Sequence, residues 1–242
     1  MSAGFFLENE LLSVSFDRSG NLVALKNLKT GHDYAGGRPV WRLYLQTANA
    51  LDVEILASDA VPTMSQVGHE IVLDYATVSL DTEILQIAVT VRVCLTGDEC
   101  RWHLEVQNRQ TDVTVRECHF PLIGNLQLVP AQALIWSRWG GERFADVRSE
   151  LRQPKMYFAS EHLFSQIAIG YPGATASTNC YTFCSDTEGL YLGCHQDSSE
   201  FTEHQVRLYG EDLECGFVRY PHLAGGQSAA LNDFVIAPYV GT

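Results

Sequence analysis

The chain has 242 residues, 46% of them hydrophobic and 19% charged, which is typical of a globular protein that can bury a sizeable core. Its 29 acidic side chains outweigh 16 basic ones, and the net charge of −13 argues against binding to nucleic acid or to an anionic membrane surface. No apolar run reaches the length of about 18 residues that a transmembrane helix needs. We therefore expect one globular domain over residues 1–242.

The N-terminus and the cysteines indicate the cellular compartment. The first residues contain no basic region before Phe5 and Phe6, so the sequence predicts no secretory signal. The seven cysteines form no Cys-x-x-Cys pair, and their odd number argues against a complete disulfide framework. We expect a cytoplasmic protein with reduced, mostly buried thiols. We expect neither a metal site nor a cofactor, because no ligand cluster or phosphate-binding loop is present.

Apolar and polar residues alternate from the start of the chain, which predicts half-buried β-strands. Leu12, Val14 and Phe16 share one face of the first clear strand, and the turn signal at residues 18–21 predicts a hairpin with 22–28. Residues 39–46 and 51–57 predict two further strands.

The clearest hairpin lies in the middle of the chain. Apolar residues alternate from Leu85 to Leu95, Thr96-Gly-Asp98 supplies a turn, and Trp102, Leu104 and Val106 continue the pattern. Strands of this length favour a broad sheet over a small barrel.

The second half of the chain continues the same pattern. The predicted strands comprise residues 113–120, 164–171, 181–184, 190–193, 205–209, 215–220 and 233–239. A total of about fifteen short-spaced strands predicts an all-β fold, a large antiparallel sandwich of two sheets. Helical spacing occurs only in residues 142–151, where we expect one or two turns at most.

An unusual segment, Trp136-Ser-Arg-Trp-Gly-Gly-Glu-Arg143, lies in the long irregular excursion between Pro130 and Pro154. Tryptophan faces stack on sugar rings, and arginine and glutamate bind hydroxyl groups, so Trp136, Arg138, Trp139 and Glu142 are candidates for substrate binding or for a domain interface. The simpler interpretation is that Trp136 ends a buried strand and Trp139 packs on another element.

Two other groups of polar residues have weaker signals. His195 and Asp197 would share one face at a strand end, where a carboxylate could orient a general base, although local hydrogen bonding explains the pair equally well. Glu211, Asp212 and Glu214 are interpreted as a solvated hairpin tip. Asp186 and Glu188 are interpreted as turn residues.

Several segments together resemble the β-supersandwich domains related to galactose mutarotase. The opening residues 7–17 and 19–31, the strand His119-Phe-Pro-Leu-Ile-Gly124, the strand Gly189-Leu-Tyr-Leu-Gly-Cys-His195 and the last strand Phe234–Gly241 carry the resemblance in this order. The pattern departs from that family at Gln196, where an aspartate is usual.

In several glycoside hydrolase families such a domain precedes a catalytic (β/α)8 barrel that supplies the nucleophile and the acid/base. The resemblance therefore implies a non-catalytic accessory domain that packs against a barrel C-terminal to Thr242 and shapes carbohydrate binding, with no catalytic residue of its own.

Two alternatives remain open at this stage. A stand-alone mutarotase or epimerase would need a general acid and base, for which His119, His195 and Glu214 are the nearest candidates. A structural, partner-binding sandwich would instead present a flat apolar patch and no pocket with converging polar groups.

Overall fold

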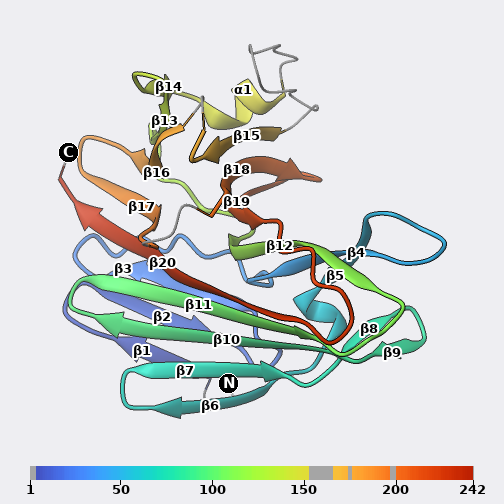
Figure 1. The fold of residues 1–242 in the computed structure, drawn as a ribbon. Coiled ribbons are helices and arrows are strands. Elements are labelled where there is room, and N and C mark those ends of the chain that lie inside the picture. The colour runs from blue at the N-terminus through green and yellow to red at the C-terminus, as the bar shows by residue number, and fades with distance from the viewer. Residues whose placement is uncertain (1–3, 153–165, 174–175, 197–199, 242) are drawn as a thin grey trace.

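The computed structural model describes residues 4–152, 166–173, 176–196 and 200–241. Two large antiparallel sheets dominate it, as the alternating pattern predicts (Figure 1). The first has nine strands in the order β14 (Glu142–Phe144), β13 (Ala133–Arg138), β16 (Ala176–Cys184), β17 (Glu188–Cys194), β20 (Ser228–Val240), β11 (Glu99–Asn108), β10 (Ile87–Thr96), β7 (Glu70–Tyr75) and β6 (Thr63–Val67).

The second large sheet has six strands and lies over the first. Its order is β15 (Gln166–Tyr171), β18 (Thr202–Tyr209), β19 (Asp212–Arg219), β12 (Thr114–Ile123), β4 (Arg42–Gln46) and β5 (Val53–Leu56). Smaller sheets contain β1 (Phe5–Glu8), β2 (Leu12–Phe16) and β3 (Leu22–Asn27), and the pair β8 (Val78–Leu80) and β9 (Glu83–Leu85).

The predicted central hairpin is confirmed. Strands β10 and β11 pair from Ile87 opposite Asn108 to Thr96 opposite Glu99, and Gly97 adopts a φ of 63° in the turn. A positive φ is easily reached by glycine, which is why the Thr-Gly-Asp segment can reverse the chain here.

Aromatic side chains from three sheets meet in the core. Trp102 of β11 contacts Phe16 of β2 and Phe120 of β12 with ring centroids 5.8 and 6.2 Å apart. Phe234 of β20 packs on Phe120 and on Phe217 of β19. These edge and tilted contacts join the nine-stranded and six-stranded sheets, so the alternate residues of each strand face one shared core.

The segment from residue 142 to 151 differs from the expectation of a short helix. Residues 142–144 form β14, which pairs with β13. The helix α1 covers only Val147–Leu151, and the Asp146 side chain caps it by accepting a hydrogen bond from the Ser149 backbone N–H at 3.0 Å. The single-turn 3-10 helix η1 covers Ala57–Asp59.

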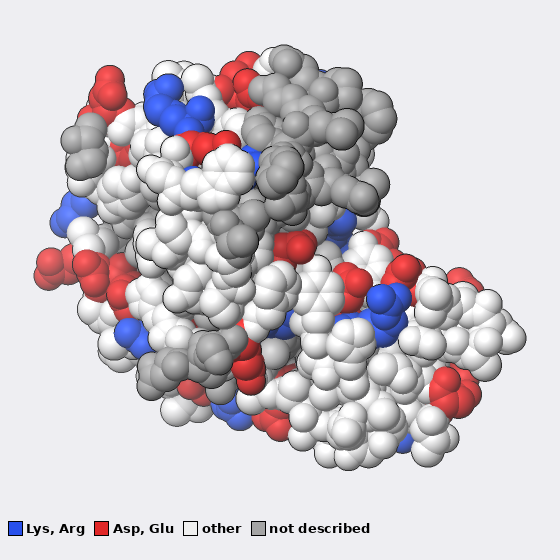
Figure 2. Space-filling model, turned by 45° about the horizontal axis from the view of Figure 1, so that its top comes forward, with Lys and Arg blue, Asp and Glu red and all other residues white. Residues whose placement is uncertain are grey.

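None of the described helices has the length and apolarity needed to cross a bilayer. All seven cysteines are free thiols, and four of them are buried. On the face in Figure 2 acidic side chains are spread more widely than basic ones, as the net charge of −13 leads us to expect.

Candidate functional site

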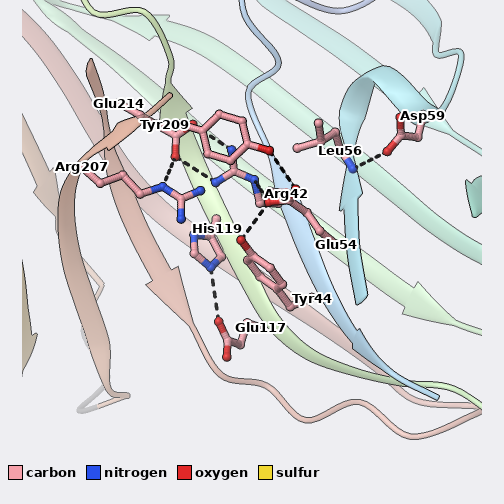
Figure 3. A network of polar contacts seen from close by, with 10 residues as sticks. All are labelled: Arg42, Tyr44, Glu54, Leu56, Asp59, Glu117, His119, Arg207, Tyr209 and Glu214. Carbon is pink, nitrogen blue, oxygen red and sulfur yellow. Dashed lines mark hydrogen bonds and ion pairs between the residues drawn. The ribbon is translucent and has the colours of Figure 1, made fainter. Parts of the chain in front are cut away.

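The face of the six-stranded sheet that points away from the core carries polar side chains. Some of them are buried, such as Arg42 and Glu214, although polar residues on such a face are usually exposed. Arg42 and Tyr44 of β4 alternate with the buried residues Leu43 and Leu45, and the buried Trp41 comes directly before the strand. The apolar set faces the core, so the polar set must point to the other side of the sheet. Neighbouring strands place further charged residues against it (Figure 3).

Arg42 is the centre of this polar group. Its side chain is only 3% exposed, and it donates two hydrogen bonds to Glu214 of β19, Nη1 to Oε1 at 2.9 Å and Nη2 to Oε2 at 2.8 Å. Its Nε lies 2.9 Å from Oε1 of Glu54 in β5. A buried guanidinium needs such partners because an unpaired charge away from water is strongly destabilising.

A second arginine holds the same carboxylate. Arg207 of β18 donates from Nε to Oε1 of Glu214 at 2.8 Å. Glu214 therefore accepts three charge-assisted hydrogen bonds, out of about four acceptor positions on a carboxylate. The Tyr209 ring lies over both guanidinium groups, with its centroid 4.6 Å from Cζ of Arg42 and 5.1 Å from Cζ of Arg207.

Two phenols complete the group around Glu54. Tyr44 donates to Oε1 at 2.8 Å and Tyr209 to Oε2 at 2.9 Å. Burial, with the hydrogen bond to Glu54, raises the pKa of both phenols above the usual value of 10.0. Both remain protonated donors at neutral pH. We call Arg42, Glu54, Arg207, Tyr209 and Glu214 the arginine network.

His119 lies at the edge of the arginine network (Figure 3). It is 3% exposed, its Nε2 is 3.3 Å from Glu117 Oε2, and its ring packs against that of Tyr44 with centroids 5.0 Å apart. Its Nδ1 has no hydrogen-bond partner among the described residues. The expectation that His119 is a strand residue is confirmed, because it belongs to β12.

A cavity of about 610 Å³ opens beside the arginine network, and we call it the network cavity. Arg42, Glu214 and Tyr209 line one side of it. Arg38 and Asp212, which form an ion pair, also line it. The other lining residues include Asn21, Trp41, Ser58, Leu122 and Asn125. Charged, polar and aromatic groups thus converge on one concave surface, while no histidine is among its described lining residues.

Three of the four candidates from the Trp-rich segment, Arg138, Trp139 and Glu142, contact one another, whereas Trp136 lies in the core. Trp136 is fully buried in β13, where its ring packs on Tyr181 at 5.1 Å, so it ends up in the core as the simpler interpretation predicted. Trp139 is 54% exposed, and the Arg138 guanidinium lies 4.6 Å from its ring centroid. Glu142 lies 3.4 Å from Arg138.

His195 lies just after β17 and is exposed. Its Nε2 is 2.8 Å from the Tyr191 hydroxyl, and its backbone N–H donates to the Asp233 carbonyl. Asp197, its predicted partner, lies outside the described residues. His195 does not line the network cavity, so the structure does not combine it with Glu214.

Two interpretations of acidic residues are wrong. Glu214 is not part of a solvated hairpin tip, since it is 5% exposed and paired with two arginines. Glu188 is not an exposed turn residue either: it is 6% exposed and accepts hydrogen bonds from Thr30 and Tyr34 at 2.8 and 3.2 Å. In both cases at least one partner is more than 150 residues away in sequence.

The described residues contain no group of three or more histidine, cysteine, aspartate or glutamate side chains that could hold a metal ion. The site as described is therefore composed of arginine, carboxylate, phenol and amide groups. Such groups bind hydroxyl-rich or polar molecules through directional hydrogen bonds.

Comparison with solved structures identifies the fold. A galactose mutarotase-like protein from Lactobacillus casei superposes with a TM-score of 0.59 at 11% identity, covering 98% of this chain and 100% of that one. The chain thus has a galactose mutarotase-like fold. No family model and no curated protein matches the sequence.

Other similar structures are much longer enzymes. A GH36 α-galactosidase from Geobacillus stearothermophilus, solved with stachyose, has a TM-score of 0.58 and 11% identity over 99% of this chain but only 41% of its own. An α-mannosidase from Enterococcus faecalis has a TM-score of 0.57 and 9% identity over 98% of this chain and 29% of its own. The fold therefore occurs both as a whole protein and as part of larger glycoside hydrolases.

Proposed function

We propose that this galactose mutarotase-like chain is a single, non-catalytic domain of a glycoside hydrolase, over residues 1–242, and that its network cavity contacts carbohydrate. In this account it packs against a catalytic (β/α)8 barrel. The observation that carries the proposal is the network cavity, in which polar side chains converge and the buried Glu214 carboxylate is held by two arginines.

The charges around the network cavity favour a neutral ligand such as a sugar. Arg38 is paired with Asp212, and Arg42 is paired with Glu214, so each positive lining group has its own carboxylate. Amide and hydroxyl groups of Asn125 and Tyr209 add neutral hydrogen-bonding capacity. A sugar phosphate would need uncompensated positive charge, which these pairs do not supply.

The same contacts argue against a stand-alone epimerase. That chemistry needs an acid and a base on either side of the anomeric carbon. Glu214 is fixed by Arg42 and Arg207, and the described wall of the network cavity has no histidine. The epimerase nevertheless stays the second candidate, because the Lactobacillus casei protein is matched over its full length.

The large similar enzymes support the association with a barrel. In the α-galactosidase and the α-mannosidase, the region like this chain is less than half of the whole protein. The rest of each chain has room for a separate catalytic domain. An accessory role for this chain agrees with the pairing of the lining carboxylates Asp212 and Glu214 with Arg38 and Arg42.

Binding of stachyose to the purified chain, measured by calorimetry, tests the proposal. We expect Asp212→Ala to weaken binding about tenfold, because it removes a carboxylate acceptor and leaves Arg38 without its partner. Asp52→Ala is the matched control, since Asp52 forms a similar ion pair with Arg116 and does not line the network cavity. Equal affinities for the two variants would contradict the proposal.

A further inference from the structure

A second cavity, of about 510 Å³, lies at the opposite end of the β18–β19 hairpin from the network cavity. Phe201, Arg219 and Tyr220 line it together with apolar residues that include Leu223 and Leu231. Strand β18 separates the two cavities by roughly 23 Å, at about 3.3 Å for each residue. They are therefore separate places on the surface, and we call this one the aromatic cavity.

Two aromatic rings form its exposed wall. Phe201 is 49% exposed and Tyr220 is 37% exposed, with ring centroids 5.9 Å apart and planes inclined by 43°. Large apolar rings that remain this accessible leave a surface that a ligand can cover. The rings are therefore tilted and not stacked face to face, and both line the cavity.

The Phe201 ring is held in place by the strand beneath it. A Cβ atom at Gly170 of β15 would lie 2.3 Å from both Cε2 and Cζ of Phe201, so only glycine allows the ring to lie this close to the backbone. Burial, with the charge of the nearby Glu203 carboxylate, raises the pKa of the Tyr220 phenol, so its hydroxyl stays protonated. The Phe201 ring is therefore packed on the backbone before any ligand binds, which lowers the entropic cost of binding.

A buried arginine lines the same cavity. Arg219 is 3% exposed, its Nη1 lies 3.2 Å from Glu200 Oε2, and its Nη2 donates to Gln196 Oε1. Its Nε has no hydrogen-bond partner among the described residues. Because Glu200 already compensates the guanidinium charge, the cavity offers hydrogen bonds without a net positive charge.

We infer that the aromatic cavity is a second saccharide-binding site, in which the apolar face of a neutral sugar ring stacks on Phe201 and Tyr220. The sugar hydroxyls bind to the polar groups of Arg219 and Glu200. The choice of a sugar as ligand rests on the proposed function. The choice of a neutral one rests on the pairing of Arg219 with Glu200.

Calorimetric titrations of the purified chain with stachyose and with α-mannotriose test the inference. We expect Phe201→Ala and Tyr220→Ala to weaken one class of binding sites at least tenfold, while Asp212→Ala affects the other class. Phe6→Ala is the matched control, because Phe6 is 58% exposed and lies outside both cavities. Phe201→Leu keeps an apolar side chain over Gly170 and should lose the stacking alone, so it serves if the alanine variant fails to fold.

The outcomes separate the two proposals. Binding that responds to Asp212→Ala but not to Phe201→Leu or Tyr220→Ala would overturn the second site and leave the proposed function standing. Binding that responds only to the aromatic variants would support the second site and contradict the role of the network cavity. If neither stachyose nor α-mannotriose binds to the unmodified chain at millimolar concentration, both the proposed function and the second site are overturned.

Discussion

Arg42 and Glu214 form a buried two-point ion pair between β4 and β19, although they lie 172 residues apart in the sequence. Arg42 is 3% and Glu214 7% exposed in their side chains, so water screens this pair little. The pair links β4 and β19 across the intervening β12 and forms one wall of the network cavity. The geometry of the site therefore depends on it.

Removing one partner of this pair should destabilise the whole domain. We expect Arg42→Met to lower the free energy of unfolding by about 3–5 kcal/mol, because Glu214 would keep a buried negative charge with fewer partners and Glu54 would lose its arginine. Urea denaturation followed by circular dichroism measures the change. Arg92→Met is the control, since Arg92 and Glu70 are both over 40% exposed and such pairs contribute about 0–1 kcal/mol. Similar losses for both variants would contradict this account of the pair.

A buried histidine should make stability depend on pH. Burial among aromatic rings, including those of Tyr181 and Phe217, lowers the pKa of His204 from 6.5 to about 3. Below pH 6.5 the unfolded chain binds a proton there and the folded chain does not. This contribution to stability is therefore complete above pH 6.5 and is lost as the pH falls toward 3.

The loss from His204 alone should reach about 2 kcal/mol at pH 5. The measurement is the free energy of unfolding between pH 7.5 and pH 5, compared between the unmodified chain and His204→Gln. Glutamine has no proton to gain in this range and can still donate to Asn179, which is 2.9 Å from His204 Nε2. An identical pH dependence in both proteins would show that His204 is not buried in its neutral form.

Replacement of glycine by alanine should lower the free energy of unfolding much more at Gly216 than at Gly140. A Cβ at Gly216 of β19 would lie 2.2 Å from the Pro121 carbonyl oxygen, which belongs to the backbone of β12 and cannot rotate away. We expect Gly216→Ala to cost about 2 kcal/mol or more, because two paired strands must separate. At Gly140 no atom lies within 4 Å, so Gly140→Ala should change the unfolding free energy by less than about 1 kcal/mol. Thermal denaturation of both variants checks the contrast.

The reading frame that encodes the chain should continue past Thr242. The accessory-domain account predicts a following segment in which strand and helix periodicities alternate and which contains paired carboxylates for glycoside hydrolysis. Sequencing of the transcript decides this point. A stop codon directly after Thr242 would contradict the attachment of a barrel within the same chain.

Local pattern was enough to predict most of the strands and the all-β class. The β10–β11 hairpin is readable from its alternation and from the Thr96-Gly-Asp98 turn, because both depend on neighbouring residues alone. Burial of Trp136 agrees with the simpler interpretation of the Trp-rich segment, in which Trp136 belongs to a buried strand. The strand Glu142–Phe144 was missed because Phe144, Val147 and Leu151 have helical spacing. The pairing of this strand with β13 cannot be read from that spacing.

The site itself could not be read from the sequence. Glu214 follows Glu211 and Asp212, and in isolation such a run is typical of a solvated turn. Its burial depends on Arg42 and Arg207, which reach it only because β18, β19, β12 and β4 are adjacent in the sheet. The available signal was the alternation of polar and buried residues on β4. The strand order was also needed, because it shows which polar residues of β4, β18 and β19 come together.

The most direct test of the central claim is the rate at which the purified chain interconverts the α and β anomers of galactose, measured by NMR exchange spectroscopy. The account predicts the rate of the buffer alone, because Glu214 is held by two arginines and the described wall of the network cavity has no histidine. An acceleration that disappears in Glu214→Gln or His119→Ala would contradict the account and identify the chain as a mutarotase.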